Sequence, residues 1–219
     1  MPTTYSEIYQ YWSKNPCQGG DDDFPFYYFK NKKVLEIGCG AGVDAVRFTN
    51  ADALYTGIDL TDIAVSLTKK KIKNKGIVIT MNAESLDFPD DYFDLIYSHG
   101  VIHHTITPQK VIEEIYRVLK PHGLFCLMIY NKLSCRYLLD IMFFRKILWI
   151  LRFKKYAEIR KQIPHPTTEQ WISINSDTLG CPQTKVYTKK AALTLVNKFN
   201  NPITFTKNFG WFRKIIAVK

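Results

Sequence analysis

The chain has 219 residues, a length that suits one compact domain, and its 46% hydrophobic and 23% charged residues are ordinary for a globular protein. This composition excludes a disordered chain, a collagen-like chain and a coiled coil. No apolar run reaches the ~18 residues of a membrane span, and residues 1–15 contain no apolar signal core, so we expect a cytoplasmic protein. The five cysteines form no CxxC pair, so we predict neither a disulfide framework nor a metal site.

The net charge of +10 is concentrated in the second half of the chain. Residues 1–131 contain 13 lysines and arginines against 16 acidic residues, whereas residues 132–219 contain 17 against 4. Such an asymmetry marks either a half that faces an anionic partner or surface, or a well-solvated lysine-rich face. Both interpretations stay open at this point.

The first 131 residues alternate between strand-like and helix-like segments. The helix-like segment at 108–119 has the clearest pattern, with a proline at its start and apolar residues at helical spacing. Alternating strands and helices predict a parallel sheet with helices on both faces. We predict strands at 34–37, 54–59, 77–80, 93–98 and 124–130, and helices at 43–50, 62–75 and 108–119.

The pattern changes after residue 131. Residues 133–163 are basic and strongly apolar without glycine or proline, which predicts one or two helices, and 164–182 are predicted to form a loop. A helix at 187–199 and two strands at 203–206 and 214–218 follow. The predicted fold class is therefore α/β, a doubly wound, mostly parallel seven-stranded sheet with a helical insertion after the fifth strand.

A glycine-rich turn lies between the first predicted strand and helix, with Gly38, Gly40 and Gly42 at alternate positions. Glycines allow a sharp turn and the close approach of a ligand to the backbone. The spacing is not that of a dinucleotide-binding loop, because the third glycine of G-x-G-x-x-G is replaced by Val43, and the Gly-Lys-Ser/Thr of a phosphate-binding loop is absent.

Three carboxylates surround this turn in the predicted sheet. Glu36 precedes it, Asp59 ends the second strand and Glu84 follows the third. An acidic residue about 20 positions after the turn, where Asp59 stands, can bind two ribose hydroxyls. Carboxylates around one crevice suit a ligand that has a ribose and positive charge, and S-adenosylmethionine meets this requirement.

These segments resemble the motifs of class I S-adenosylmethionine-dependent methyltransferases, in particular the small-molecule branch that includes methyltransferase domain 11. The resemblance covers residues 33–131, the expected cofactor-binding core, with residues 1–32 as an N-terminal lid and 132–219 as a helical cap and the strands that complete the sheet. The matching segments are 34–42 and 57–60, then 82–88 beside the adenine, 93–104 at the fourth strand and 114–123 before the fifth.

The resemblance implies a role for each position. The glycine turn would lie against the methionine part of the cofactor, Asp59 would bind the ribose, and Leu60 would contact the adenine. Ser98 and His99 would border the methyl-transfer site, which releases S-adenosylhomocysteine. The implied cofactor-binding residues are Glu36, Gly38, Cys39, Gly40, Gly42, Asp59, Leu60, Ala83, Glu84, Ser98 and His99.

His103 and His104 follow the fourth strand, where the methyl acceptor should lie, and are the predicted catalytic residues. A hydroxyl acceptor needs a base, and histidine can accept a proton near neutral pH, whereas a neutral amine or a thiolate needs none. The alternative is that the pair only orients or packs its loop. Predicted acceptor contacts are Tyr9, Trp12, Tyr28, Trp171 and Tyr187, with His165 as a further candidate; ordinary packing at the sheet edge is the alternative.

We predict an enzyme that transfers a methyl group to an oxygen, nitrogen or sulfur atom of a small molecule, for which an anionic compound is one candidate. Residues 136–160 are interpreted as a substrate cap or dimer interface, with peripheral contact to an anionic membrane as the alternative. Residues 98–101 differ from the Asn/Asp-Pro-Pro-aromatic motif of nucleic-acid amino methyltransferases, which disfavours base methylation. The remaining alternatives are action on RNA or at a membrane through the basic half, and a cofactor-binding partner protein without catalysis.

Overall fold

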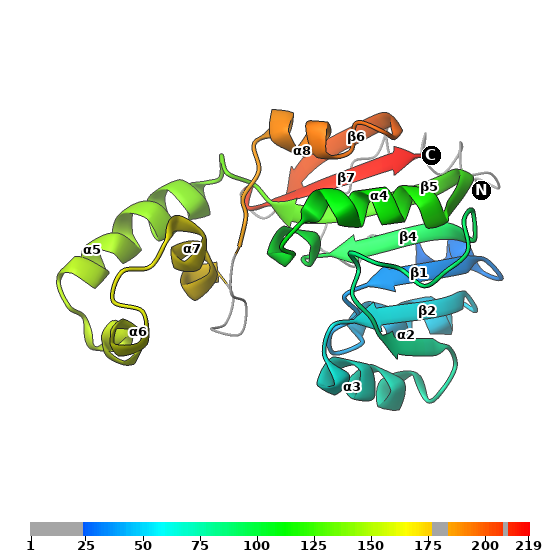
Figure 1. Cartoon of the computed structure of the whole chain (residues 1–219), viewed down its shortest axis with the longest axis horizontal. Helices are drawn as coiled ribbons and strands as arrows, with labels where there is room; N and C mark the ends of the chain where they lie inside the picture. Colours follow the sequence, from blue (N-terminus) through cyan, green and yellow to red (C-terminus); the bar gives the residue numbers. More distant parts are fainter. Residues whose placement is uncertain (1–23, 177–183, 208–209) are drawn as a thin grey trace.

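The computed structural model describes residues 24–176, 184–207 and 210–219, and these form a seven-stranded sheet with helices on both faces (Figure 1). The strand order is β3-β2-β1-β4-β5-β7-β6; β1 to β5 are parallel, and β7 runs antiparallel to both of its neighbours. The strands are β1 (Lys33–Ile37), β2 (Leu54–Asp59), β3 (Ile77–Thr80), β4 (Phe93–His99), β5 (Leu119–Tyr130), β6 (Asn200–Lys207) and β7 (Phe212–Val218).

The two faces of the sheet bury alternate residues of the same strands. In β1, Val34 packs with α2 (Val43–Asn50), α3 (Asp62–Ile72) and the short η2 (Phe26–Phe29), whereas its neighbour Leu35 packs with α4 (Pro108–Val118) and α8 (Lys189–Leu195). Successive strand side chains point to opposite faces, so one short apolar run supplies two cores. Helix α4 begins with Pro108 at its first position and buries one apolar stripe against the sheet: Val111, Ile112, Ile115 and Val118.

The fold class and the seven-stranded sheet confirm the sequence prediction, while some boundaries differ. Helix α3 ends at Ile72 rather than at 75, because Lys73 and Asn74 adopt left-handed φ angles of 51° and 61°. Strand β5 begins at Leu119 rather than at 124, since a shift in register with β4 lets it run past Pro121. Helix α8 is shorter than the predicted 187–199.

The predicted loop at 164–182 is wrong in its described part, which contains α7 (Thr168–Ser176). Burial of Trp171 and Ile172 stabilises this helix, and such tertiary packing leaves no strong local signal in the sequence. The helices between β5 and α7 are η4 (Arg136–Phe144, π-helical), α5 (Arg145–Ile150), the short η5 (Lys154–Tyr156) and α6 (Ala157–Gln162).

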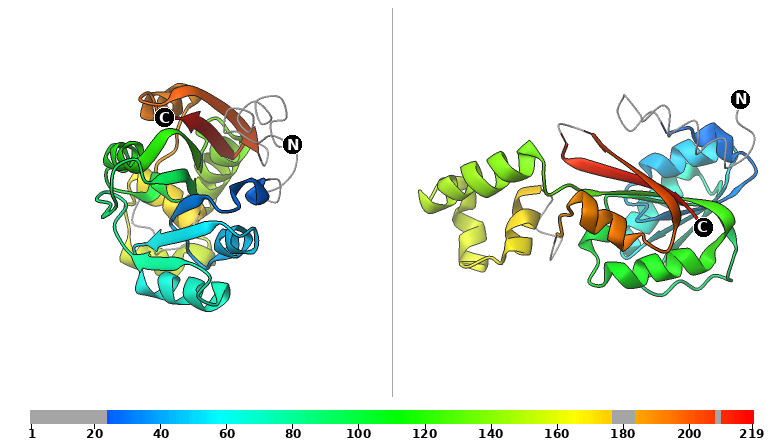
Figure 2. Two further views of the ribbon diagram at one scale, coloured as in Figure 1. Left: turned by 90° about the vertical axis from the view of Figure 1, so that its right-hand side faces the viewer. Right: turned by 90° about the horizontal axis from the view of Figure 1, so that it is seen from above.

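Residues 132–176 form a helical extension that lies beyond the carboxyl ends of the parallel strands (Figures 1 and 2). It has its own apolar cluster, which includes Tyr137 and Ile141. Tyr130 at the end of β5 joins this cluster and stacks on Trp211, with ring centroids 4.3 Å apart, so the extension is anchored where β5 ends and β7 begins. Among the described residues, no helix has the length and apolarity needed to cross a membrane.

Candidate active site

The glycine turn between β1 and α2 places three glycines in left-handed conformations, with φ of +78° at Gly38, +51° at Gly40 and +74° at Gly42. A Cβ at Gly38 would lie 2.1 Å from the Val101 side chain, and one at Gly42 would lie 2.9 Å from Thr68 Oγ1. A Cβ at Gly40 would meet only a backbone oxygen, at 4.0 Å. Packing therefore requires glycine at two positions, whereas Gly40 faces open space in which a ligand can lie.

Asp59 lies half-buried at the end of β2 and connects the strand to the glycine turn. Its Oδ2 accepts a hydrogen bond from Gly40 N at 3.0 Å, and its Oδ1 accepts from Thr61 N and Oγ1, both at 3.0 Å. An ionised carboxylate has about four acceptor sites, so ribose hydroxyls would share this group with the loop. Leu60, the next residue, is 72% exposed and offers an apolar surface beside the same turn.

Glu36 is only 4% exposed, so it lies behind the turn instead of opening into the crevice. The Tyr55 hydroxyl donates to its Oε2 at 2.6 Å. The pKa of Glu36 is raised to about 8, mainly by burial and also by the nearby charges of Asp44 and Asp59, while the Tyr55 hydrogen bond opposes the shift. Glu36 is therefore mostly protonated at neutral pH when the site holds no cation.

Asp44, in the first turn of α2, is a carboxylate of this site that the sequence prediction missed. Its Oδ2 accepts a hydrogen bond from the Tyr97 hydroxyl at 3.1 Å and lies 3.8 Å from His99 Nδ1, and its Oδ1 accepts from Arg47 at 2.9 Å. Asp44 thus joins the glycine turn to the end of β4. The available signal was its position, two residues after the last glycine of the turn.

Ala83 and Glu84, predicted to lie beside the adenine, follow β3. Ala83 is buried in the core under α4, and Glu84 Oε1 accepts a hydrogen bond from Thr107 N at 2.8 Å. Cys39 is also buried, and burial raises the pKa of its thiol to about 11, so the thiol stays neutral.

The two predicted catalytic histidines lie between the ends of β4 and β5 in different environments. His103 is fully buried, its ring lies 4.1 Å from that of Tyr130, and neither ring nitrogen has a hydrogen-bond partner among the described residues. Burial holds the pKa of His103 well below its usual range. His104 is half-buried, with its Nδ1 3.1 Å from Thr184 Oγ1. Solvent therefore reaches His104 but not His103.

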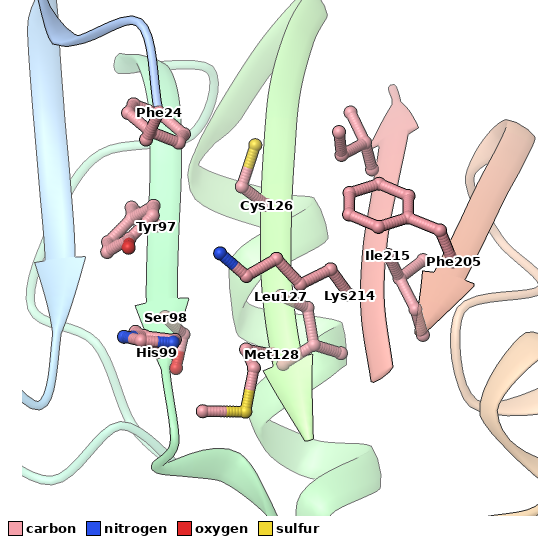
Figure 3. A pocket seen from close by; sticks show the side chains of 11 residues that line it. Phe24, Tyr97, Ser98, His99, Cys126, Leu127, Met128, Phe205, Lys214 and Ile215 are labelled. Atoms are coloured by element: carbon pink, nitrogen blue, oxygen red, sulfur yellow. The ribbon is translucent and has the colours of Figure 1, made fainter. Parts of the chain in front are cut away.

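A small pocket, with room for about one water molecule, lies against β4, β5, β6 and β7, beside the end of β4 (Figure 3). The side chain of Lys214 extends from β7 across β5 toward Tyr97 and His99, so a cation lies among aromatic and apolar groups. Sequence analysis did not single out Lys214, because its strand lies far along the chain from β4. The pocket is lined by Phe24, Tyr97, Ser98, His99, Cys126, Leu127, Met128, Phe205, Lys214, Ile215 and Ile216.

The predicted acceptor contacts within the described residues are not brought together. Tyr9 and Trp12 lie outside the described residues. Tyr28 is half-buried against the aromatic cluster of η2, and Trp171 is buried in the helical extension, where its Nε1 donates to Ile141 O at 2.9 Å. Tyr187 is half-buried beside the core, and its backbone N donates to Tyr130 O at the end of β5. His165 is exposed on the helical extension.

Residues 35–127 match the family described as a methyltransferase domain. A ubiquinone/menaquinone biosynthesis C-methyltransferase from Pectobacterium carotovorum is 32% identical over 111 residues, which are 47% of this chain and 44% of the relative. A ubiquinone biosynthesis O-methyltransferase from Actinobacillus pleuropneumoniae is 27% identical over 164 residues, covering 71% of this chain and 69% of the relative. The chain thus spans less than half the length of the first of these relatives.

The same architecture occurs in a solved S-adenosylmethionine-dependent methyltransferase from Mesorhizobium loti, with a TM-score of 0.63 and 13% identity over 87% of this chain and 92% of that one. Sheet order, glycine turn and family match agree on one class of protein. Residues 35–127 are thus similar to a methyltransferase domain, and the sheet order agrees with the fold of S-adenosylmethionine-dependent methyltransferases.

Proposed function

We propose that this protein transfers the methyl group of S-adenosylmethionine to a small-molecule acceptor. The observation that carries the proposal is the open space at Gly40 beside the Asp59 carboxylate, because it brings an approachable backbone and a hydrogen-bonding carboxylate to one turn at the carboxyl ends of β1 and β2. The residues present fit the cofactor: backbone space at the turn for the methionine part, Asp59 for the ribose and the exposed Leu60 for the adenine. When bound, the cofactor supplies a methyl group activated by a sulfonium centre.

The acceptor is proposed to approach beside the end of β4, where the small pocket lies. Methyl transfer is an in-line displacement, so the protein must mainly align the acceptor and exclude water. The apolar lining there suits an apolar part of a small molecule, and the ammonium group of Lys214 favours an acceptor with a negatively charged group.

Oxygen, nitrogen and sulfur remain the proposed acceptor atoms. One of the two relatives is an O-methyltransferase, which supports oxygen. The other is a C-methyltransferase, which supports adding carbon to the atoms tested. Where the acceptor is a hydroxyl, the solvent-accessible His104 is the better placed of the two predicted bases.

Asp59→Ala tests the proposed function. We expect the affinity for S-adenosylhomocysteine, measured by calorimetry, to fall at least tenfold, because hydrogen bonds to a charged group contribute about 1.5–3 kcal/mol. Asp52→Asn is the matched control: it removes a carboxylate just before the opposite end of β2, where an exposed side chain pairs with Lys30.

Turnover is then measured as the S-adenosylhomocysteine formed from S-adenosylmethionine in the presence of each of a panel of hydroxyl, amine, thiol and carbon acceptors, with and without a carboxylate. Unchanged affinity in Asp59→Ala would contradict the ribose role. Cofactor binding without turnover on any acceptor would instead favour a cofactor-binding partner protein.

A further inference from the structure

The helical extension carries most of the exposed apolar side chains of the described structure. Of the large hydrophobic residues that the structure describes, seventeen are exposed, and nine of these lie within residues 133–153. The surface of a soluble protein rarely exposes so many neighbouring apolar side chains unless they form an interaction site. These nine are Leu133, Leu138, Leu139, Phe143, Phe144, Ile147, Ile150, Leu151 and Phe153.

The exposed side chains lie on the face of the η4–α5 helix that its own packing does not use. Tyr137 and Ile141 bury their side chains in the cluster that joins this helix to α7. Each has an exposed counterpart two residues later, Leu139 and Phe143, and two residues along a helix is roughly half a turn. We call Leu139, Phe143, Ile147 and Ile150, which are 56%, 55%, 39% and 74% exposed, the outer stripe.

Basic residues accompany the outer stripe. Residues 132–163 contain nine lysines and arginines against two acidic residues. Asp140 pairs with Arg145 at 2.8 Å, and Glu158 pairs with Lys161 at 2.8 Å, so both acidic groups are already neutralised by neighbours. The other seven basic residues include Lys146 inside the stripe and Lys154 and Lys155 just beyond it.

We propose that the outer stripe and its basic neighbours dock this protein on the surface of an anionic lipid bilayer. An interfacial helix combines an apolar face, which enters the boundary of the acyl chains, with lysines and arginines that meet anionic headgroups. The positive charge of the segment is complementary to an anionic bilayer surface. The exposed apolar side chains favour a bilayer over a partner that binds through charge alone, because such a partner would not bury them. Docking would hold the carboxyl edge of the sheet, which faces the extension, near the lipid (Figure 1).

Vesicle co-sedimentation of the whole chain tests this proposal, with phosphatidylcholine alone or mixed with phosphatidylglycerol. We expect binding that requires the anionic lipid and weakens at high salt. Phe143→Ser combined with Ile150→Ser should weaken binding at least tenfold, and Lys154→Gln with Lys155→Gln about fivefold for each charge removed. Ile77→Ser, another exposed apolar site, and Lys70→Gln with Lys71→Gln on α3 are the matched controls, expected to bind like the wild type.

Wild-type protein that stays in the supernatant with anionic vesicles overturns the proposal. So does a dimer that the Phe143→Ser/Ile150→Ser variant abolishes, because a second copy is then the occupant of the stripe. Loss of binding in the lysine variant alone points to a purely electrostatic partner such as RNA and also overturns it. The assay needs neither cofactor nor acceptor, so its result is independent of the proposed methyl transfer.

Discussion

An added Cβ would clash with other side chains at Gly38 and Gly42 but not at Gly40. The first two glycines are therefore required by packing, whereas Gly40 leaves room for a ligand. Gly40 and Gly210 share two properties: both have a positive φ, and at both an added Cβ would have no heavy atom closer than 3.8 Å. We expect Gly40→Ala and Gly210→Ala each to lower the free energy of unfolding by about 1–2 kcal/mol, the usual cost of left-handed backbone.

Only Gly40→Ala should also weaken cofactor binding, by at least tenfold in calorimetry, because its methyl group would occupy ligand space. Equal affinities in the two variants would show that this turn does not hold the cofactor.

The buried carboxyl of Glu36 links stability to pH. A pKa of about 8 in the folded chain lies above the unfolded value of 4.5, so the folded state binds the extra proton between these limits. The stability that Glu36 contributes is thus fully present below about pH 4.5 and is lost as the pH rises through 8. We expect the free energy of unfolding of the cofactor-free wild type to fall, relative to Glu36→Gln, by up to about 1.4 kcal/mol per pH unit between pH 5 and 8.

Urea denaturation of both proteins at several pH values measures this difference, in which the other titrating groups cancel. Parallel pH profiles would show that Glu36 is ionised in the folded chain.

The adjacent histidines should respond differently to the same substitution. His103→Leu replaces a buried ring without hydrogen-bond partners among the described residues, so we expect stability and turnover to be nearly retained. His104→Leu should retain cofactor affinity but lower the turnover of a hydroxyl acceptor by about 10²–10⁴-fold, the usual contribution of a general base. Measuring melting temperature, cofactor affinity and turnover together separates the two. Lost turnover in a stable His103→Leu protein would instead make His103 the base.

At the scale of elements, the antiparallel strand β7 supplies the lysine that lines the pocket beside the end of β4. Lys214 of β7 lies opposite Met128 of β5 in the strand pairing, and this register directs the lysine side chain into the pocket beside His99. We expect Lys214→Met to raise the KM of a carboxylate-bearing acceptor about tenfold or more, since a charged hydrogen bond is lost, and to leave cofactor affinity unchanged. Lys198→Met, an exposed lysine outside the pocket, controls for net charge. An unchanged KM would place the acceptor elsewhere.

The helical extension shows a second property at this scale. Tyr137 and Ile141 of its first helix are buried in the cluster with Trp171, so this tryptophan packs the extension, whereas the sequence prediction assigned it to the acceptor. The surface available to a partner is the outer stripe. An apolar run in a sequence indicates a helix, but it does not say which of its faces another helix will cover.

For the whole molecule, the local signals for the fold were strong in residues 33–131. Alternating short strands and amphipathic helices, with glycines at one strand end and an acidic residue at the next, predict a doubly wound sheet and its ligand crevice. The weaker predictions concern residues 132–219, where α7 was missed and η4 to α6 were predicted only as one or two helices. Helices there depend on packing between distant segments, which leaves little periodic signal.

The sequence by itself determined the sheet, the glycine turn and the place of Asp59, because these follow from backbone conformation and strand periodicity within short segments. Only the tertiary structure decided which of two adjacent histidines is buried, that Asp44 joins the turn to β4, and that Lys214 reaches the pocket. These features depend on contacts between residues far apart in the chain. Such contacts are set by strand order and by the packing of whole elements, so no local pattern encodes them.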